Sequence, residues 1–333
     1  MKTTSKITDV AERAGVAKST VSNVLTGRKY VSEELRAKVM QACRELDFHP
    51  NFYASALSSR RSNIIALLLE SNNDVEKPMY GELIISCMKA ASKFGYSLLI
   101  YYNSDSEILL NTLRQGMAPI DGAVLMSPCI DDKRLKQIKS ECIDCVVIGR
   151  PDSEVELNYV DIDNKKLVSD VCRTLVSTYG TDIYLLNSDY SLTISQDRAT
   201  SFKAFCQANS IDFATHMFES KESSAEDGYE IAAKTIKKDS VYITANGQLA
   251  LGVYRAAQER GLEIGKDIAV FALGRSQQHG LFKPQLSYAE QSYSLLGENA
   301  VGMLLDRING VIIEKNILIE SKPIFTDSAK RGN

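Results

Sequence analysis

Near its N-terminus the chain reads Ile7-Thr-Asp-Val-Ala-Glu-Arg-Ala-Gly-Val-Ala-Lys-Ser-Thr-Val-Ser-Asn-Val-Leu-Thr-Gly27. The spacing of its apolar residues predicts two short helices, Ile7–Ala14 and Lys18–Leu25. Gly15 stands between them, and glycine readily adopts the left-handed conformation that ends a helix. Two helices joined by a turn of three or four residues form a helix-turn-helix unit. This stretch therefore predicts a small all-α head that contains a helix-turn-helix unit.

A third helix is expected after Ser32, a favourable N-cap residue. Glu33 and Glu34 follow in the first turn, where the helix dipole favours acidic side chains. Pro50 is expected to stop this helix. Its predicted apolar face comprises Leu35, Val39, Ala42 and Leu46. The three helices together predict a domain over residues 1–50.

Charge is distributed unevenly along the chain. Residues 1–63 hold 11 Lys/Arg against 6 Asp/Glu, a net charge of +5, although the whole chain carries −3. The remainder therefore carries −8. A basic head on an acidic body indicates that the head meets a polyanion and that the body does not.

The composition is that of an ordinary globular protein. Hydrophobic residues make up 44% of the 333 residues and charged residues 24%. The longest apolar run, Ile64–Leu69, is far too short for a membrane helix. The N-terminus lacks the apolar segment of a secretory signal. We therefore expect a cytoplasmic protein.

The cysteines and histidines give no sign of a metal centre. The seven cysteines are odd in number and scattered, so reduced thiols are expected. Cys142 and Cys145 have the spacing of a redox or zinc motif, but they lead into an apolar strand and no second pair completes a zinc site. We interpret both as small core residues. No metal, cofactor or catalytic residue is expected.

The segment Ile7–Gly27 is similar, nearly position by position, to the DNA-binding head of the lactose/galactose repressor family of bacterial regulators. Val31-Ser-Glu-Glu-Leu-Arg36 and Pro50-Asn51 continue the likeness in order and spacing, and it extends through the body to the end of the chain. The resemblance implies that the second helix lies in the major groove of operator DNA. It also implies that residues 51–63 form a hinge helix between head and body.

By this resemblance Lys18, Ser19 and Asn23 contact base edges. Lysine can donate to guanine, and asparagine can pair with adenine. Leu57 stands at the wedge position of the hinge, with Ala54 one turn earlier, so both are expected in the minor groove. The candidates for further backbone contacts are Thr8, Thr20, Ser22, Tyr30 and Asn51. The alternative for each is an ordinary solvated side chain.

From Ile64 onward, short apolar strands alternate with amphipathic helices, which predicts two doubly wound α/β lobes with parallel sheets. The first series of expected strands is Ile64–Leu69, Ser97–Tyr101, Gly122–Met126 and Cys145–Ile148. The second series is Ile183–Leu186, His216–Phe218, Val241–Thr244 and Ile268–Leu273. The resemblance implies a body of periplasmic-binding-protein type over 64–333. Its lobe 1 is expected at about 64–160 and 290–320, and its lobe 2 at about 161–289 and 321–330.

Ligands of such bodies bind between the lobes, near the carboxyl ends of the strands. The positions that match the family's effector pocket are Tyr80, Arg150, Arg198, Asn246, Arg275 and Gln291. Plain packing is the alternative for Tyr80 and Gln291, and a surface ion pair is the alternative for Arg198.

Two positions of the expected effector pocket depart from the family. Gly247 and Gly274 stand where relatives carry an Asp that accepts hydrogen bonds from sugar hydroxyls. Arg150, Arg198 and Arg275 are expected to converge instead, and arginine suits carboxylate or phosphate oxygens. This pattern favours an acidic or phosphorylated carbohydrate derivative over a neutral sugar. The alternative is that Asn246 and water replace the Asp.

These observations predict a ligand-responsive regulator that binds pseudo-palindromic double-stranded operator DNA as a homodimer. We expect a repressor of carbohydrate-utilisation genes that a small sugar-derived effector releases. An activator or a co-repressed member of the family is an alternative. A transport-type sugar-binding protein would share the body but not the basic head. An enzyme is disfavoured because the chain has no phosphate-binding loop and no nucleophile elbow.

Overall fold

The computed structural model describes residues 5–26, 29–48, 61–70, 78–103, 120–152, 155–276 and 279–330. Contacts between Cα atoms divide the chain into two units, Met1–Asn63 and Ile64–Asn333. Each unit is described by itself. Most of the predicted hinge, residues 51–60, lies outside the described residues.

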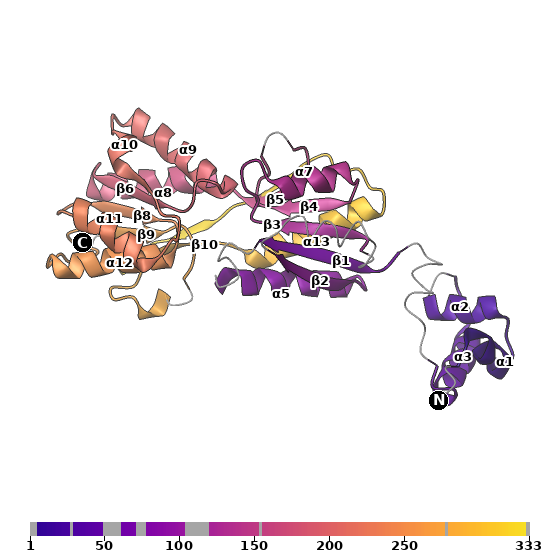
Figure 1. The fold of residues 1–333 in the computed structure, drawn as a ribbon. Helices are drawn as coiled ribbons and strands as arrows, with labels where there is room; N and C mark the ends of the chain where they lie inside the picture. The colour runs from indigo at the N-terminus through magenta and orange to yellow at the C-terminus, as the bar shows by residue number, and fades with distance from the viewer. Residues whose placement is uncertain are drawn as a thin grey trace. The chain divides into compact units, whose positions relative to one another are not determined.

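The described residues of the first unit form a head of three helices, drawn in indigo in Figure 1. Its helices are α1 (Ile7–Ala14), α2 (Lys18–Thr26) and α3 (Glu33–Glu45). Gly15 ends α1 with φ 66° and ψ 36°, the left-handed conformation expected of it. The Ser32 hydroxyl accepts a hydrogen bond from the Leu35 amide at 3.5 Å, so the predicted N-cap is confirmed. The buried core of the head comprises Val10, Ala11, Val21, Val24, Val39, Ala42 and Cys43.

The third helix is shorter than predicted. It ends at Glu45, and Asp47 turns the chain with a positive φ of 48°. Pro50, which was expected to stop the helix, lies outside the described residues. After the helix, Leu46 and Phe48 pack against the core of the head, and the Phe48 amide donates to the Cys43 carbonyl at 2.9 Å. An ion pair between Arg13 and Glu45 joins the ends of α1 and α3.

The second unit contains two sheets of six strands each, which confirms the predicted α/β class. The first sheet has the order β11-β5-β4-β3-β1-β2, and all of its pairings are parallel. Its strands are β1 (Ile64–Glu70), β2 (Ser97–Asn103), β3 (Gly122–Met126), β4 (Cys145–Ile148), β5 (Asn158–Ile162) and β11 (Ile317–Ile319). Helices cover both faces, as buried parallel sheets require. They are α5 (Pro78–Lys93) and α13 (Tyr293–Ile308) on one face and α7 (Lys133–Ser140) on the other.

The second sheet has the order β12-β10-β9-β8-β6-β7, and only its β10–β12 pairing is antiparallel. Its strands are β6 (Ile183–Asn187), β7 (Met217–Glu219), β8 (Val241–Thr244), β9 (Ala269–Ala272), β10 (Ser287–Glu290) and β12 (Lys322–Ile324). Helices α8 (Asn164–Tyr179) and α9 (Thr193–Ala208) pack on one face. Helices α11 (Ala225–Thr235) and α12 (Gly247–Glu259) pack on the other.

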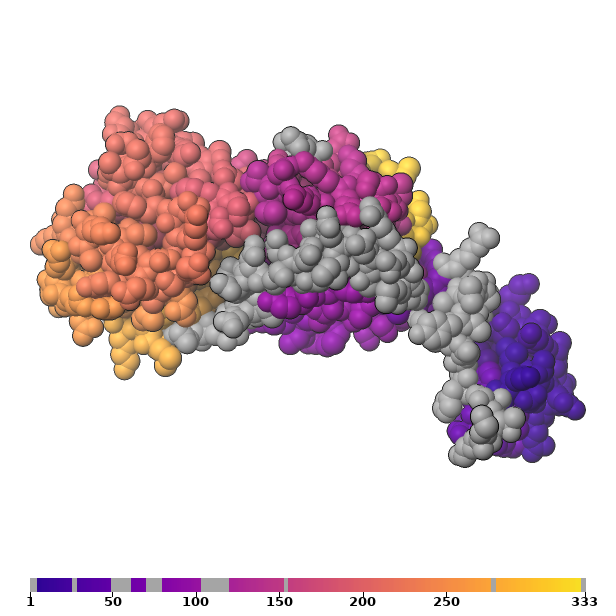
Figure 2. Space-filling view, in the orientation of Figure 1, coloured from indigo at the N-terminus to yellow at the C-terminus, as the bar shows by residue number. Residues whose placement is uncertain are grey.

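The chain passes between the lobes more than once. After β10 it returns to the first lobe as α13, which Figure 1 shows in yellow beside the magenta strands β3 and β4. Figure 2 shows yellow residues of the last part of the chain on the surface of the first lobe. The first crossing follows β5, a strand absent from the predicted series, so Asp161 and Ile162 belong to the first sheet. His216, predicted in a strand, ends the short helix α10 (Phe213–His216).

Candidate functional site

Polar side chains of α2 are exposed at the surface of the head. Lys18 and Ser19 at its N-terminal end are exposed, and Asn23 is partly exposed one turn later. Val21 and Val24 face the opposite way, into the core. Ser19 and Asn23 lie on one side of the helix, because positions four residues apart stack on successive turns. Lys18 lies next to them at the exposed N-terminal end of α2.

The other predicted DNA contacts differ in exposure. Thr8 is exposed on the first turn of α1, and Tyr30 is 94% exposed. Thr20 and Ser22 are partly buried on α2. The remaining three predicted contacts, Asn51, Ala54 and Leu57, lie outside the described residues.

The second unit contains a pocket of about 280 Å³ at the carboxyl ends of strands from both sheets. This is the position at which open α/β sheets bind ligands. Residues that end or follow β3, β4, β5, β6, β8, β9 and β10 contribute to it. Its apolar lining includes Leu83, Met126, Pro128, Ile148, Leu192 and Leu296. The volume is near the lower end of the range for small-molecule sites, roughly 300–1,000 Å³.

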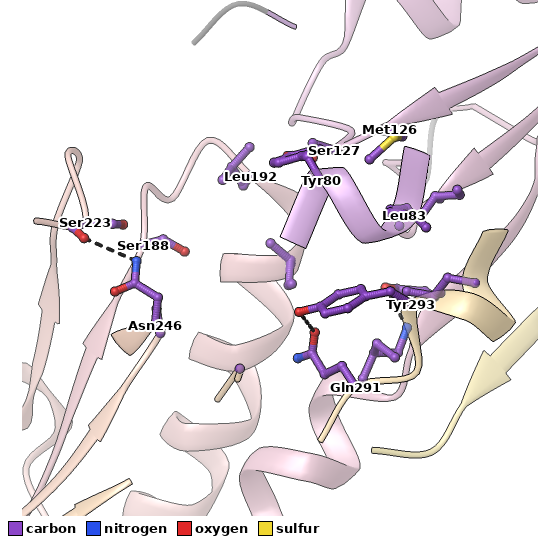
Figure 3. Close-up of a pocket in the computed structure, with 18 of the residues that line it drawn as sticks. Tyr80, Leu83, Met126, Ser127, Ser188, Leu192, Ser223, Asn246, Gln291 and Tyr293 are labelled. Carbon is purple, nitrogen blue, oxygen red and sulfur yellow. Dashed lines mark hydrogen bonds between the residues drawn. The ribbon is translucent and has the colours of Figure 1, made fainter. Parts of the chain in front are cut away.

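Five of the six predicted effector residues line this pocket, but some of their polar groups are already used within the fold. The Tyr80 hydroxyl shares a hydrogen bond with that of Ser127. The Asn246 side chain caps α12, because its oxygen accepts from the Leu249 amide at 2.9 Å. Its nitrogen donates to the Ser223 carbonyl at 3.2 Å, as Figure 3 shows. Asn246 therefore shapes the wall of the pocket.

Gln291 is occupied in the same way. Its amide nitrogen donates to the Leu273 carbonyl at 2.7 Å. Its oxygen accepts from the Tyr293 hydroxyl at 3.0 Å, as Figure 3 shows. The effect of Gln291 is to fix the Tyr293 ring against the pocket. Burial raises the pKa of Tyr293 to about 12, so its hydroxyl stays protonated.

Arg198 is the cation at the base of the pocket. It lies in the second turn of α9, is only 5% exposed, and donates from Nε to Asn164 Oδ1 at 3.1 Å. Burial lowers its pKa to about 10, against the opposing influence of Tyr293 and Asp161, so it remains charged at neutral pH. Among the described residues it forms no ion pair within 4.0 Å. The other N–H groups of its guanidinium are therefore available to a ligand.

The expected convergence of three arginines does not occur. Arg150 is not among the residues that line the pocket, because it forms an ion pair with Asp197 of α9. Arg275 lies at the rim, with its side chain 46% exposed and 3.6 Å from Glu290. Only Arg198 is both buried and uncommitted. The Arg150–Asp197 pair instead connects the end of the first sheet to a helix of the second lobe.

The two glycines at the family's Asp positions have different surroundings. A Cβ atom on Gly247 would lie 2.5 Å from Ser276 Cβ, so a side chain there requires the loop to move. A Cβ atom on Gly274 would meet nothing closer than the Tyr293 hydroxyl at 4.0 Å. The absence of a carboxylate is thus enforced by packing at position 247 but not at position 274.

The pocket nevertheless contains a carboxylate that the sequence analysis missed. Asp161 lines it from β5, where it is paired with Leu318 of β11 and is 6% exposed. Its Oδ1 accepts from the Ile162 amide at 2.8 Å, whereas its Oδ2 is buried and has no hydrogen-bond partner among the described residues. Burial raises the pKa of Asp161 to about 7. An acidic residue between Val160 and Ile162 was the available signal.

Neither a metal site nor a membrane helix is found in the part of the chain that the structure describes. No group of three His, Cys, Asp or Glu residues there is placed to hold a metal ion. No helix of the described ranges is long and apolar enough to cross a bilayer. Cys145 is buried as predicted, and burial raises its pKa to about 12. The interpretation of Cys142 as a core residue is wrong, because it lies exposed in a turn with a φ of 55°.

Comparison with known proteins agrees with this two-part organisation. Residues 6–51 match the family described as bacterial regulatory proteins, lacI family, and residues 167–328 match the periplasmic binding protein-like domain. The chain is 26% identical over 332 residues to the HTH-type transcriptional regulator RegA of Clostridium saccharobutylicum, covering 97% of this chain and 98% of that protein. It is 28% identical to DegA of Bacillus subtilis, covering 89% of each.

Solved structures share the fold. The lac repressor dimer bound to operator and the anti-inducer ONPF matches with a TM-score of 0.84 and 23% identity, over 98% of this chain and all of that one. The complex of the regulator CelR with cellobiose matches with a TM-score of 0.73 and 23% identity, over 97% of this chain and 99% of that one.

Proposed function

Since the chain belongs to the lactose/galactose repressor family of bacterial transcriptional regulators, we propose that it represses carbohydrate-utilisation genes until a small sugar-derived effector binds between its lobes. The chain is a DNA-binding transcriptional regulator with a helix-turn-helix head. It acts on double-stranded operator DNA as a homodimer, and we infer that it does so in the cytoplasm. Relatives that cover most of its length are transcriptional regulators, and we infer that it catalyses no reaction.

The observation that carries the proposal is that one chain has two separate sites. The basic head has a polar face on α2, and the body has a pocket that contains a buried arginine without an ion pair among the described residues. Arg198 is that arginine, and a guanidinium donates hydrogen bonds to sugar oxygens as well as to anions. A transport-type binding protein would need the pocket alone. Asp161 and Arg198 come from different lobes, so a ligand that touches both changes the relative free energies of the lobe arrangements.

Two of the three arginines that were expected to bind an acidic or phosphorylated effector are occupied within the fold. Arg150 and Arg275 already face the carboxylates of Asp197 and Glu290. The pocket also contains Asp161, which would repel an anion when ionised. We therefore favour an effector rich in hydroxyl groups, because each hydroxyl both donates and accepts a hydrogen bond.

Footprinting of the DNA upstream of the gene, with and without candidate sugars, tests the proposal. We expect a protected pseudo-palindrome, because two symmetric recognition helices read two half-sites. Affinity should fall steeply with salt, since phosphate contacts release counterions. Protection of an asymmetric site with a flat salt dependence would contradict the proposal. Protection that strengthens with the sugar would make the sugar a co-repressor.

Asn23→Ala should relax the base preference at one position in each half-site. The free energy of binding should weaken by about 1–3 kcal/mol for sites with the preferred base and by little for the others, because a base-edge contact is lost. Binding-site selection with wild-type and variant protein measures this difference. The exposed Lys29 provides a matched control, since Lys29→Ala should weaken all sequences alike, if at all. An equal loss for every base with Asn23→Ala would make Asn23 a backbone contact.

A further inference from the structure

Asp161 is the polar group of the pocket that the fold leaves least satisfied. Its Oδ2 is shielded from water yet receives no hydrogen bond from any described residue. A buried carboxylate normally has donors on both oxygens, since an unpaired buried charge destabilises a fold. No described residue donates a hydrogen bond to Oδ2, and Asp161 lines the ligand pocket. This combination indicates a group that a bound molecule completes.

The charged groups around Asp161 come from three segments. Arg198 and Asp197 lie on α9 of the second lobe, and Arg150 follows β4 of the first. The two arginines favour the ionised form of Asp161, whereas Asp197 disfavours it. Asp197 and Arg150 pair with one another, so their opposing influences largely cancel. A ligand that contacts Asp161 therefore also lies next to the positive charge of Arg198.

We propose that Asp161 is a specificity-determining residue whose free carboxylate oxygen accepts a hydrogen bond from the effector, so that the pocket selects a sugar bearing a hydroxyl or ammonium donor next to the oxygen that Arg198 holds. This inference rests on the proposed function and names the chemistry of its ligand. The effector then touches the first sheet through Asp161 and the second lobe through Arg198. Sugars that carry a carboxylate or phosphate at that place are rejected, because two anions would be buried together.

A consequence of this assignment is that binding depends on pH. A donor binds the ionised carboxylate more strongly than the neutral acid. Because the pKa of Asp161 is about 7, the ionised fraction rises about tenfold between pH 6 and pH 8. Affinity for a neutral sugar should rise with it, whereas affinity for an anionic sugar should fall.

Calorimetric titration of the full chain with matched hexose derivatives tests the inference. The panel contains the neutral hexose, the 2-amino-2-deoxyhexose, the uronate and the 6-phosphate of the gluco, galacto and manno series, each at pH 6 and pH 8. We expect a neutral or amino hexose to bind most tightly. A preference for the amino sugar assigns the donor as ammonium, and a preference for the neutral sugar assigns it as hydroxyl.

Asp161→Asn keeps the shape of the residue but removes its charge. For the tightest sugar it should weaken binding roughly 10- to 100-fold at pH 8, the loss expected for a hydrogen bond to a charged acceptor. It should also abolish the rise in affinity for a neutral sugar between pH 6 and pH 8. Asp170→Asn, which changes a carboxylate of α8 that lines no part of the pocket, is the matched control and should bind like wild type.

The stability of the ligand-free protein gives a second readout. Burial raises the pKa of Asp161 from 3.8 to about 7, so between these values the folded protein holds a proton that the unfolded chain has released. Stability therefore falls as the pH rises through this window. Asp161→Asn should remove that fall and melt above wild type at pH 8. An identical pH profile of melting for both proteins would mean that Oδ2 has a partner, and would overturn the inference.

The binding outcomes separate the two proposals. A uronate or phosphate as the tightest ligand, or Asp161→Asn binding as tightly as wild type, overturns the role of Asp161 but leaves a ligand-controlled regulator. If no member of the panel binds or changes operator affinity, the proposed sugar response fails, and the inference fails with it.

Discussion

Replacement of Arg198 by methionine should abolish the response to effector while leaving operator binding intact. The guanidinium is buried at the base of the pocket, and among the described residues it has only a single hydrogen bond, to Asn164. A hydrogen bond that involves a charged group contributes about 1.5–3 kcal/mol, and two such bonds to a sugar give a loss of about 3 kcal/mol or more. Effector affinity should fall at least about 100-fold. The head, which makes no use of Arg198, should keep its DNA affinity.

Operator affinity, measured by fluorescence anisotropy with the tightest hexose present and absent, checks this expectation. The variant should stay bound to operator at sugar concentrations that release wild type. Arg173→Gln removes an exposed arginine of α8 and should respond normally. Arg198→Lys should respond only weakly, since lysine cannot reproduce the arginine fork. Release of Arg198→Met by the same sugar concentration as wild type would show that Arg198 does not hold the effector.

Strong local periodicity made part of the fold predictable. The helix Ile7–Ala14 and the strands Gly122–Met126 and Val241–Thr244 have their predicted bounds. The helix has helical apolar spacing, and the two strands are short, nearly continuous apolar runs. The strands that were missed are short. Three of them are mixed in polarity, and the apolar β11 (Ile317–Ile319) has only three residues. β12, for example, is Lys322–Ile324 with a proline at its centre, and only its pairing with β10 makes it a strand.

The pocket was less predictable, because its chemistry depends on which side chains the fold has already used. Sequence alone suggests that Asn246 and Gln291 are free amides, yet one caps a helix and the other holds Tyr293. Arg150 directly follows Gly149, which lines the pocket, but its charge is paired with that of Asp197, 47 residues away in the sequence. Asp161 enters the pocket only because the chain crosses between lobes directly after β5. Such pairings are set by the tertiary fold and leave no local pattern.

Gly252→Ala should destabilise the second lobe strongly, because helices α11 and α12 touch through their backbones. A Cβ atom on Gly252 would lie 2.1 Å from the Ala225 carbonyl oxygen and 2.3 Å from the Tyr229 amide nitrogen. These are backbone atoms of α11, so the helices themselves must separate. Facing it, a Cβ atom on Gly228 would lie 2.2 Å from the Leu249 carbonyl oxygen. Neither contact can be relieved by turning a side chain.

The expected loss for Gly252→Ala is about 3 kcal/mol, at the upper end for an overpacked interior, even though alanine is the better helix former by about 1 kcal/mol. Gly302 of α13 is the matched control, since a Cβ atom there meets nothing within 4 Å. Gly302→Ala should be neutral or more stable by up to about 1 kcal/mol. Because the chain has no tryptophan, urea unfolding is best followed by far-ultraviolet circular dichroism. The urea concentration at the midpoint of unfolding should fall for Gly252→Ala and should stay the same or rise for Gly302→Ala. Equal midpoints for the two variants would mean that α11 and α12 can move apart without cost, and the close crossing would then not be what holds the second lobe together.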